Sequence, residues 1–198
     1  MKFWLLLFLP IILNIHFAVA QKISLEKWAL HNVDSLHKNH VDTIEYYHAY
    51  CGECFISGKP TDTLPRHQCE LENSWVEIEN IIIYKQKSKY YSLTFDCNYP
   101  PIKKELKGCK SIDYFLSVIP VLNKRDKTIT EMYRHNKFLG PIVSDGGYEE
   151  VFLYCRSIKQ HVDIQDYQKT DKTWKSYFWI DKEIKLLTLV GADLFSKN

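Results

Sequence analysis

The segment that most constrains this chain runs from Thr43 to Phe55, T-I-E-Y-Y-H-A-Y-C-G-E-C-F. β-Branched and aromatic residues dominate its first part, so the pattern predicts a strand that carries Cys51 and Cys54 at its end. Two cysteines at this spacing after a strand are typical of thiol–disulfide exchange, although zinc ligands and ordinary disulfides use the same spacing. If a helix follows, its positive end faces Cys51 and stabilises the thiolate.

Residues 1–20 have the pattern of a secretory signal. Lys2 precedes the apolar run Phe3–Ile15, and A-V-A ends at Ala20. The run is interrupted by Pro10 and is short for a membrane span. We therefore expect a soluble mature chain that begins at Gln21, either secreted or held in the endoplasmic reticulum lumen. The chain ends F-S-K-N, so a KDEL-type retention signal is not expected to hold it there.

Removal of the signal leaves 178 residues, which is enough for one domain with a substantial core. Without Lys2, 25 basic residues face 24 acidic ones. This balance gives no reason to expect a nucleic-acid partner or a membrane-surface partner. All six cysteines lie in the mature part, and an even number in an exported chain favours disulfides.

The spacing of apolar residues predicts alternating helices and strands. Helices are expected over Ser24–Lys38, through Leu71, Trp75, Ile78 and Ile82, from Pro100-Pro101 through Ile102, Leu106 and Cys109, and through Tyr148, Val151, Phe152, Cys155 and Ile158. Strands are expected over Val41–Tyr50, Tyr90–Cys97, Phe115–Leu122 and Lys127–Arg134, with a loop over residues 57–70. Val151–Cys155 also fits a strand, and Tyr177–Val190 is apolar and β-prone. This order predicts an α/β fold with a mixed central sheet.

With these elements in place, the chain resembles the thioredoxin superfamily, most closely the thioredoxin-type domains of protein disulfide isomerases and quiescin sulfhydryl oxidases. Ile44–Tyr50 and the C-G-E-C that follows resemble the family's V-E-F-Y-A-P-W strand and C-G-H-C. Leu93–Cys97 resembles the next strand, and Ser117–Pro120 resembles the strand entry that bears the cis-proline. The similarity covers roughly Leu25 to Ile158. It implies a three-layer thioredoxin-like sandwich over residues 21–159, followed by a C-terminal extension over residues 160–198.

The resemblance also assigns roles to single residues. Cys51 is expected to attack as the thiolate, and Cys54 to resolve the mixed disulfide. If Glu45 points inward, burial raises its pKa and makes it a proton acceptor for Cys54; an exposed edge position is the alternative. The residues expected to contact substrate are Tyr50, Gly52, Glu53, Ile119 and Pro120.

The chain departs from the family in three places. Tyr50 replaces the usual tryptophan, Glu53 replaces histidine or proline, and residues 57–70 resemble an insertion after the motif. The negative charge of Glu53 disfavours the Cys51 thiolate, so we expect a weaker oxidant than the family's usual members.

Four further cysteines are left for structural disulfides, with three connectivities open. We favour Cys97–Cys109, which would close one βα unit, and this leaves Cys69 with Cys155. No second Cys/His pair at ligand spacing follows the motif, so no metal site is expected.

The sequence therefore predicts a secretory-pathway thiol–disulfide oxidoreductase that acts on protein thiols or disulfides without a cofactor. Two alternatives stay open. One is a thioredoxin-fold binding module in which the Cys51–Cys54 disulfide is permanent. The other is a secreted lipocalin-like barrel that binds a ligand, in which residues 146–155 form a strand.

Overall fold

The computed structural model describes residues 25–52, 75–96, 99–135, 137, 140 and 146–195. In chain order its elements are α2 (Leu25–Lys38), β1 (Thr43–Gly52), β2 (Trp75–Gln86), β3 (Lys89–Asp96), β4 (Tyr99–Leu106), α3 (Lys110–Arg134), β5 (Gly146–Cys155), β6 (Ile158–Gln165), the 3-10 helix η1 (Asp166–Lys169), α4 (Lys172–Lys175) and α5 (Ile180–Phe195).

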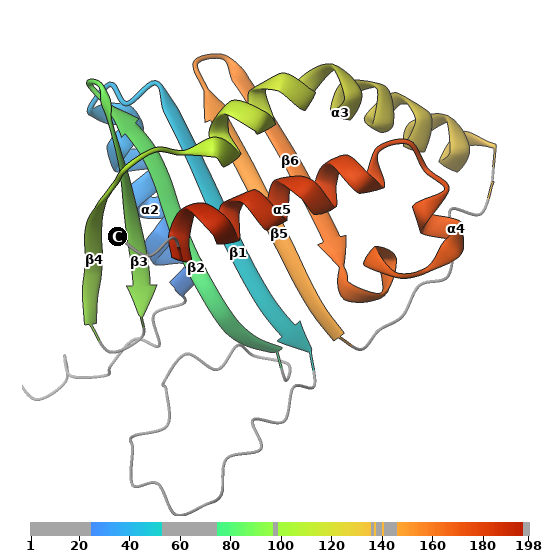
Figure 1. Cartoon of the computed structure of the whole chain (residues 1–198), viewed down its shortest axis with the longest axis horizontal. Coiled ribbons are helices and arrows are strands. Elements are labelled where there is room, and N and C mark those ends of the chain that lie inside the picture. The colour runs from blue at the N-terminus through green and yellow to red at the C-terminus, as the bar shows by residue number, and fades with distance from the viewer. Residues whose placement is uncertain are drawn as a thin grey trace, which may run out of the picture.

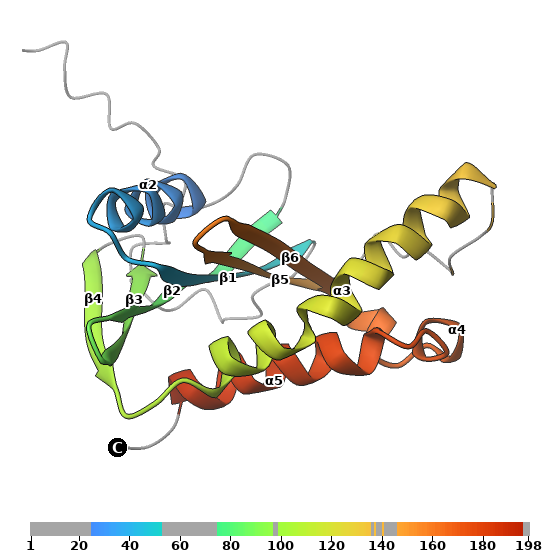
Figure 2. The same cartoon turned by 90° about the horizontal axis from the view of Figure 1, so that it is seen from above.

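The strands form one six-stranded sheet in the order β4-β3-β2-β1-β5-β6 (Figure 1). Every neighbouring pair is antiparallel. Helix α2 covers one face of the sheet, while α3 and α5 lie side by side on the other face (Figure 2). β1 is central in this arrangement, because it pairs with β2 on one side and with β5 on the other.

This topology contradicts the predicted thioredoxin-like sandwich. A thioredoxin-type sheet contains parallel strands joined by crossover helices, whereas β1 to β4 here form consecutive antiparallel pairs. The predicted cis-proline strand entry is also wrong. Ile119 and Pro120 lie inside helix α3, and the described residues contain no cis peptide bond.

Three predicted elements are confirmed with small changes at their ends. The helix predicted over Ser24–Lys38 is α2, which buries Leu25, Ala29 and Val33 on one side. The strand predicted over Val41–Tyr50 is β1, and the strand predicted over Tyr90–Cys97 is β3. Composition identifies these segments: α2 buries one stripe of residues, and β1 and β3 are rich in β-branched and aromatic residues.

The helix predicted through Leu71 and Ile82 is wrong, because Trp75–Gln86 is strand β2. Ile82 packs on the α2 side of the sheet, while Ile81 and Ile83 pack on the α3–α5 side. Since both faces of this strand are covered, its apolar residues do not alternate with polar ones. The helix predicted to open at Pro100-Pro101 is likewise a strand, β4, at the edge of the sheet where proline is tolerated.

The strands predicted over Phe115–Leu122 and Lys127–Arg134 are both parts of the 25-residue helix α3. Phe115, Val118 and Leu122 are its buried positions in this region, at a helical spacing of three and four residues. Pro120 lies on the exposed side of the helix, where water can reach the backbone that lacks its usual hydrogen bond.

The helix predicted through Tyr148 and Ile158 is wrong, and the competing strand interpretation is confirmed as β5. Val151 and Leu153 are fully buried on one face of β5. Aromatic side chains occupy alternate positions on the other face, so both faces carry ring or aliphatic carbon and the strand period is hidden.

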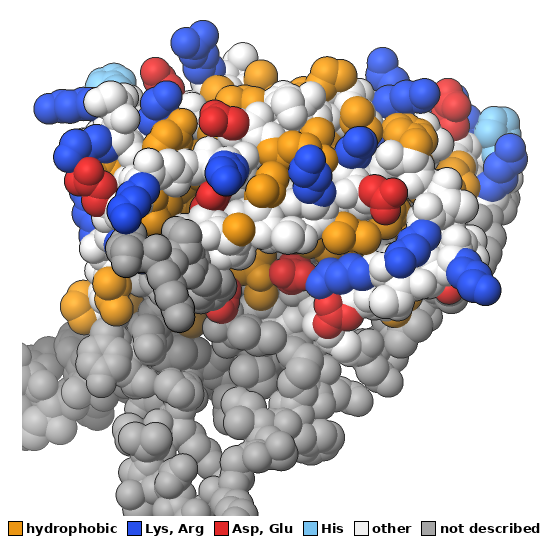
Figure 3. Space-filling model, in the orientation of Figure 1, with side chains coloured by type: hydrophobic (Ala, Val, Ile, Leu, Met, Phe, Trp, Pro, Cys, Tyr) orange, Lys and Arg blue, Asp and Glu red, His pale blue; other side chains and the backbone are white. Residues whose placement is uncertain are grey.

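The residues predicted as a C-terminal extension complete the sheet and its core. Position 160, where the extension was predicted to begin, falls within β6. The β-prone stretch Tyr177–Val190 lies mostly in helix α5, which packs Leu186 and Val190 against the sheet. Basic and acidic side chains are interspersed on the outer face of α3 and α5 (Figure 3). Of the helices described here, none is both long and apolar enough to cross a membrane.

Candidate functional site

A cavity of about 380 Å³ lies where the carboxyl end of β1 meets the last turns of α5. We call it the strand-end cavity. It is lined by Tyr47, Ala49, Tyr50, Glu79, Gly147, Tyr148, Glu149, Asp166, Leu187, Gly191 and Leu194. Its volume is in the range of sites that hold small organic molecules.

The floor of the cavity is a row of residues on three neighbouring strands. Ala49 of β1 pairs with Glu79 of β2 and with Glu149 of β5. Directly paired residues point to the same face of a sheet, so the small alanine side chain leaves a hollow between two carboxyl groups. A β-bulge follows Ala49 on the β2 side, where Tyr50 pairs with Glu77. Bulges of this kind are common next to binding sites.

Helix α5 supplies the opposite wall. Leu187 and Leu194 give it apolar carbon, and Gly191 lies between them. A Cβ atom on Gly191 would meet nothing within 4 Å. No close contact therefore requires glycine at this helical position, although glycine costs about 0.5–1 kcal/mol there relative to alanine. Its effect is to widen the cavity opposite Ala49.

Glu149 takes part in a polar network at the rim. The Tyr47 hydroxyl donates a 2.8 Å hydrogen bond to Glu149 Oε1, and Lys169 Nζ forms an ion pair with Glu149 Oε2. Lys169 also lies 2.7 Å from Asp166 Oδ1, and Asp166 accepts a 3.1 Å hydrogen bond from the backbone N–H of Gly147. Lys169 thus offsets two carboxylates at once.

Glu79 has no such partner. Its carboxyl makes no ion pair or hydrogen bond with any residue that the structure describes. Burial raises the pKa of Glu79, and the charge of Glu149 raises it further. A half-buried carboxyl group at a cavity, with a perturbed pKa and without a cation, is the arrangement expected where a ligand completes the charge balance.

The sequence-predicted residues divide into three groups. Tyr50 lines the cavity, and the backbone of Cys51 and Gly52 ends β1 beside it, paired with Gly147 and Gly146. Glu53 and Cys54 lie outside the described residues. Ile119 and Pro120 lie in α3 and do not line the cavity, so the substrate contacts predicted for them are not supported by this geometry.

Glu45 points inward, which is one of the two alternatives that the sequence left open, and its expected partner Cys54 lies outside the described residues. Glu45 is fully buried between β1 and the first turn of α3, and burial raises its pKa to about 8. Its Oε2 accepts a 2.7 Å hydrogen bond from the Ser111 hydroxyl, while Oε1 has no partner. The Cys109 thiol lies 3.2 Å from the same hydroxyl. Glu45 therefore faces Cys109 and Ser111 within the core.

Cys109 and Cys155 form no disulfide with another described residue, and the predicted pairings with Cys97 and Cys69 stay predictions. Those two partners lie outside the described residues. Cys109 is buried, and burial together with the charge of Glu45 raises its pKa to about 12. The described part of the chain contains no group of three or more His, Cys, Asp or Glu side chains arranged to hold a metal ion.

Sequence reasoning missed Glu79, Glu149 and Gly191. Alternation of glutamate with apolar residues in W-V-E-I-E-N-I-I-I was the available signal for Glu79, and it was hidden because a helical period fitted the same stretch.

Comparison of the chain with protein-family models, curated proteins and solved structures gave no match. The site is therefore interpreted from its geometry alone.

Proposed function

We propose that this protein binds a small organic amine in the strand-end cavity, with the ammonium group against Glu79 and Glu149 and the apolar part against Leu187 and Leu194. The observation that carries the proposal is the Glu79 carboxyl, which pairs with no cation of the described residues and lies across Ala49 from Glu149. Three acidic side chains line this end of the cavity, and Lys169 pairs with two of them, Glu149 and Asp166. The described side chains here are therefore more acidic than basic. A cation fits that field and an anion does not.

The apolar wall selects among cations. A bare metal ion gains nothing from Leu187 and Leu194, whereas an alkyl or aryl chain buries carbon against them. Ala49 and Gly191 provide the space for that chain, because neither has a side chain large enough to fill the hollow between the sheet and α5. The expected ligand is therefore a primary amine with a short apolar body.

Calorimetric titration with hexylamine, hexanol and hexanoate tests this proposal, since the three differ only in the head group. We expect hexylamine to bind, and the alcohol and the carboxylate to bind far more weakly. The variant Gly191→Met keeps both glutamates and fills the cavity, so it should abolish hexylamine binding while the protein stays folded. Equal affinity for the three compounds, or undiminished binding by the methionine variant, would refute the assignment.

A second function has one specific observation in its favour: β1 does end at Cys51-Gly52, as the sequence predicted for a strand that carries a thiol pair. Thiol–disulfide exchange by Cys51 and Cys54 is therefore kept as a second proposal. The carboxyl groups of Glu79, Glu149 and Asp166 line the neighbouring cavity and disfavour a thiolate, so exchange should be slow.

Insulin reduction by the wild type and by Cys51→Ala separates the two proposals. Catalysis that disappears in the alanine variant would support exchange. A reduction potential of the Cys51–Cys54 pair below about −300 mV, with no catalysis, would instead indicate a structural disulfide.

A further inference from the structure

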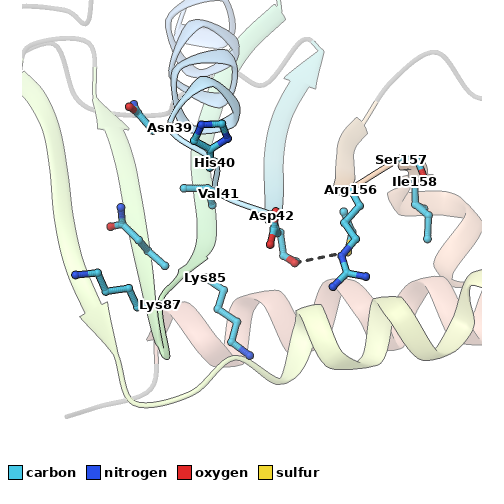
Figure 4. A pocket seen from close by; sticks show the side chains of 12 residues that line it. Asn39, His40, Val41, Asp42, Lys85, Lys87, Arg156, Ser157 and Ile158 are labelled. Atoms are coloured by element: carbon cyan, nitrogen blue, oxygen red, sulfur yellow. Dashed lines mark hydrogen bonds between the residues drawn. The ribbon is translucent and has the colours of Figure 1, made fainter.

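A second cavity, of about 830 Å³, lies at the opposite end of β1 from the strand-end cavity (Figure 4). We call it the turn pocket, because three turns form it. They contribute residues 39–43 between α2 and β1, 85–87 at the β2–β3 hairpin and 155–158 at the β5–β6 hairpin. A 3.0 Å hydrogen bond from the backbone N–H of Arg156 to the carbonyl of Asp42 joins two of these turns.

Basic side chains outnumber acidic ones in the turn pocket. Lys85, Lys87 and Arg156 line it together with His40, and Asp42 is the acidic residue among its lining side chains. None of the two lysines and the arginine forms an ion pair with another described residue. Lys85 lies above the ring of Tyr90, with Nζ 5.3 Å from its centroid, which orients the lysine without neutralising it.

The backbone at three of these positions is unusual. His40, Lys87 and Arg156 have φ angles of 58°, 58° and 52°, and they are the non-glycine residues with positive φ in the described part of the chain. All three line the turn pocket. The left-handed region favours glycine and tolerates asparagine, aspartate and histidine, whereas lysine and arginine have a cost there.

Each position is one where glycine is the common choice. His40 follows the end of α2, where the N–H of Val41 bonds back to the carbonyl of Leu36, and glycine usually occupies such a site. Lys87 and Arg156 open two-residue hairpin turns, each followed by serine, where glycine, asparagine or aspartate is preferred. Lysine and arginine thus replace the locally favoured residue at two separate hairpin turns, which meet the turn of His40 at one pocket.

From this coincidence we infer that the turn pocket binds a small molecule bearing at least two oxyanion groups, such as phosphates or carboxylates. A single small anion would occupy little of the space and would meet few of the cations, which come from different turns. Arg156 supplies a forked donor suited to a phosphate or carboxylate, and Lys85 and Lys87 supply point charges. The site is distinct from the strand-end cavity, whose side chains and charge differ.

Titration calorimetry at low ionic strength with inorganic pyrophosphate and, separately, citrate tests this inference and distinguishes a phosphate ligand from a carboxylate ligand. The variants Lys87→Gly and Arg156→Gly remove a charge and place the locally favoured residue in the turn. Each should weaken binding at least about tenfold. In the absence of ligand, each should unfold at a temperature equal to or above that of the wild type.

Lys127→Gln on the outer side of α3 is the matched charge control and should bind both anions as the wild type does. Hexylamine binding should be unchanged in the two glycine variants. The inference is overturned if neither anion binds the wild type, if the control loses affinity as the glycine variants do, or if the glycine variants are less stable without ligand.

Discussion

The hydroxyl of Ser111, in the first turn of α3, donates a 2.7 Å hydrogen bond to Oε2 of the fully buried Glu45 on β1. The backbone N–H of the same serine donates a 2.7 Å hydrogen bond to Asp193 Oδ2 near the end of α5. Ser111 thus joins the central strand to both helices on that face. Glu45 is fully buried at this junction and its hydrogen-bond partner is a neutral hydroxyl, so the stability of the junction depends on pH.

Glu45→Gln should alter how stability depends on pH. The pKa of Glu45 is about 8 in the folded protein against 4.5 for the free side chain. The unfolded chain therefore releases this proton at lower pH than the folded protein does. The contribution of Glu45 to the stability of the folded state is fully present below about pH 4.5 and is lost as the pH rises toward 8. Urea unfolding gives the free energy of unfolding of the wild type and of the glutamine variant at each pH. The wild-type value minus the variant value should be about 3–5 kcal/mol lower at pH 9 than at pH 4.5. Parallel pH profiles would contradict this.

Arg125→Ala should destabilise the protein strongly. The Arg125 guanidinium on α3 is buried, pairs with buried Glu183 on α5 and donates a 2.7 Å hydrogen bond to the carbonyl of His161 on β6. Removing it leaves a buried carboxyl without its cation, at a cost of about 3–5 kcal/mol. The double variant Arg125→Met with Glu183→Leu should recover most of that loss in urea unfolding. A loss below about 1 kcal/mol for the single variant would contradict the packing of α3 on α5.

Pro120→Ala should stabilise the protein by about 1–2 kcal/mol, because it restores a backbone donor within α3 and removes a ring that helices disfavour. Part of the gain is offset because alanine leaves the unfolded chain more freedom. The urea midpoint is the measurement. A clear loss of stability would contradict the placement of Pro120 on the exposed side of α3.

The two described free cysteines should differ in reactivity. Cys109 is 3% exposed and its pKa is raised to about 12, whereas Cys155 is partly exposed. In the native protein, iodoacetamide should modify Cys155 faster by about two orders of magnitude or more. In denaturant the two should react alike. If neither reacts until a reductant is added, both are held in disulfides, as the sequence predicted.

How much of this fold the sequence predicted depends on whether the composition of a segment, and not only its apolar period, identifies it. β1 was predicted because T-I-E-Y-Y-H-A-Y is rich in strand formers, and α2 because it buries one stripe of residues. β2 and β5 were taken for helices because both of their faces carry aliphatic or aromatic side chains, so the period of two disappears. The apolar run around Phe115 was taken for a strand because α3 is apolar on more than its buried stripe.

The site shows the same division. Cys51 and Tyr50 were placed correctly at the end of a strand, because a local pattern is sufficient for that. The row of Glu79, Ala49 and Glu149 depends on the register of three strands that are far apart in sequence. Register is set by pairing across the sheet, and a single sequence does not reveal it when the strand period is hidden.

The most direct test of the central claim is the affinity of hexylamine for the wild type and for Glu79→Gln, measured by titration calorimetry at neutral pH. Glu105→Gln is the matched control, because that glutamate is exposed and pairs with Lys89 at the far edge of the sheet. A charged hydrogen bond of about 1.5–3 kcal/mol predicts a loss of roughly tenfold to a hundredfold for Glu79→Gln and none for the control. Equal binding by Glu79→Gln and the wild type, or no binding by the wild type, would contradict the account.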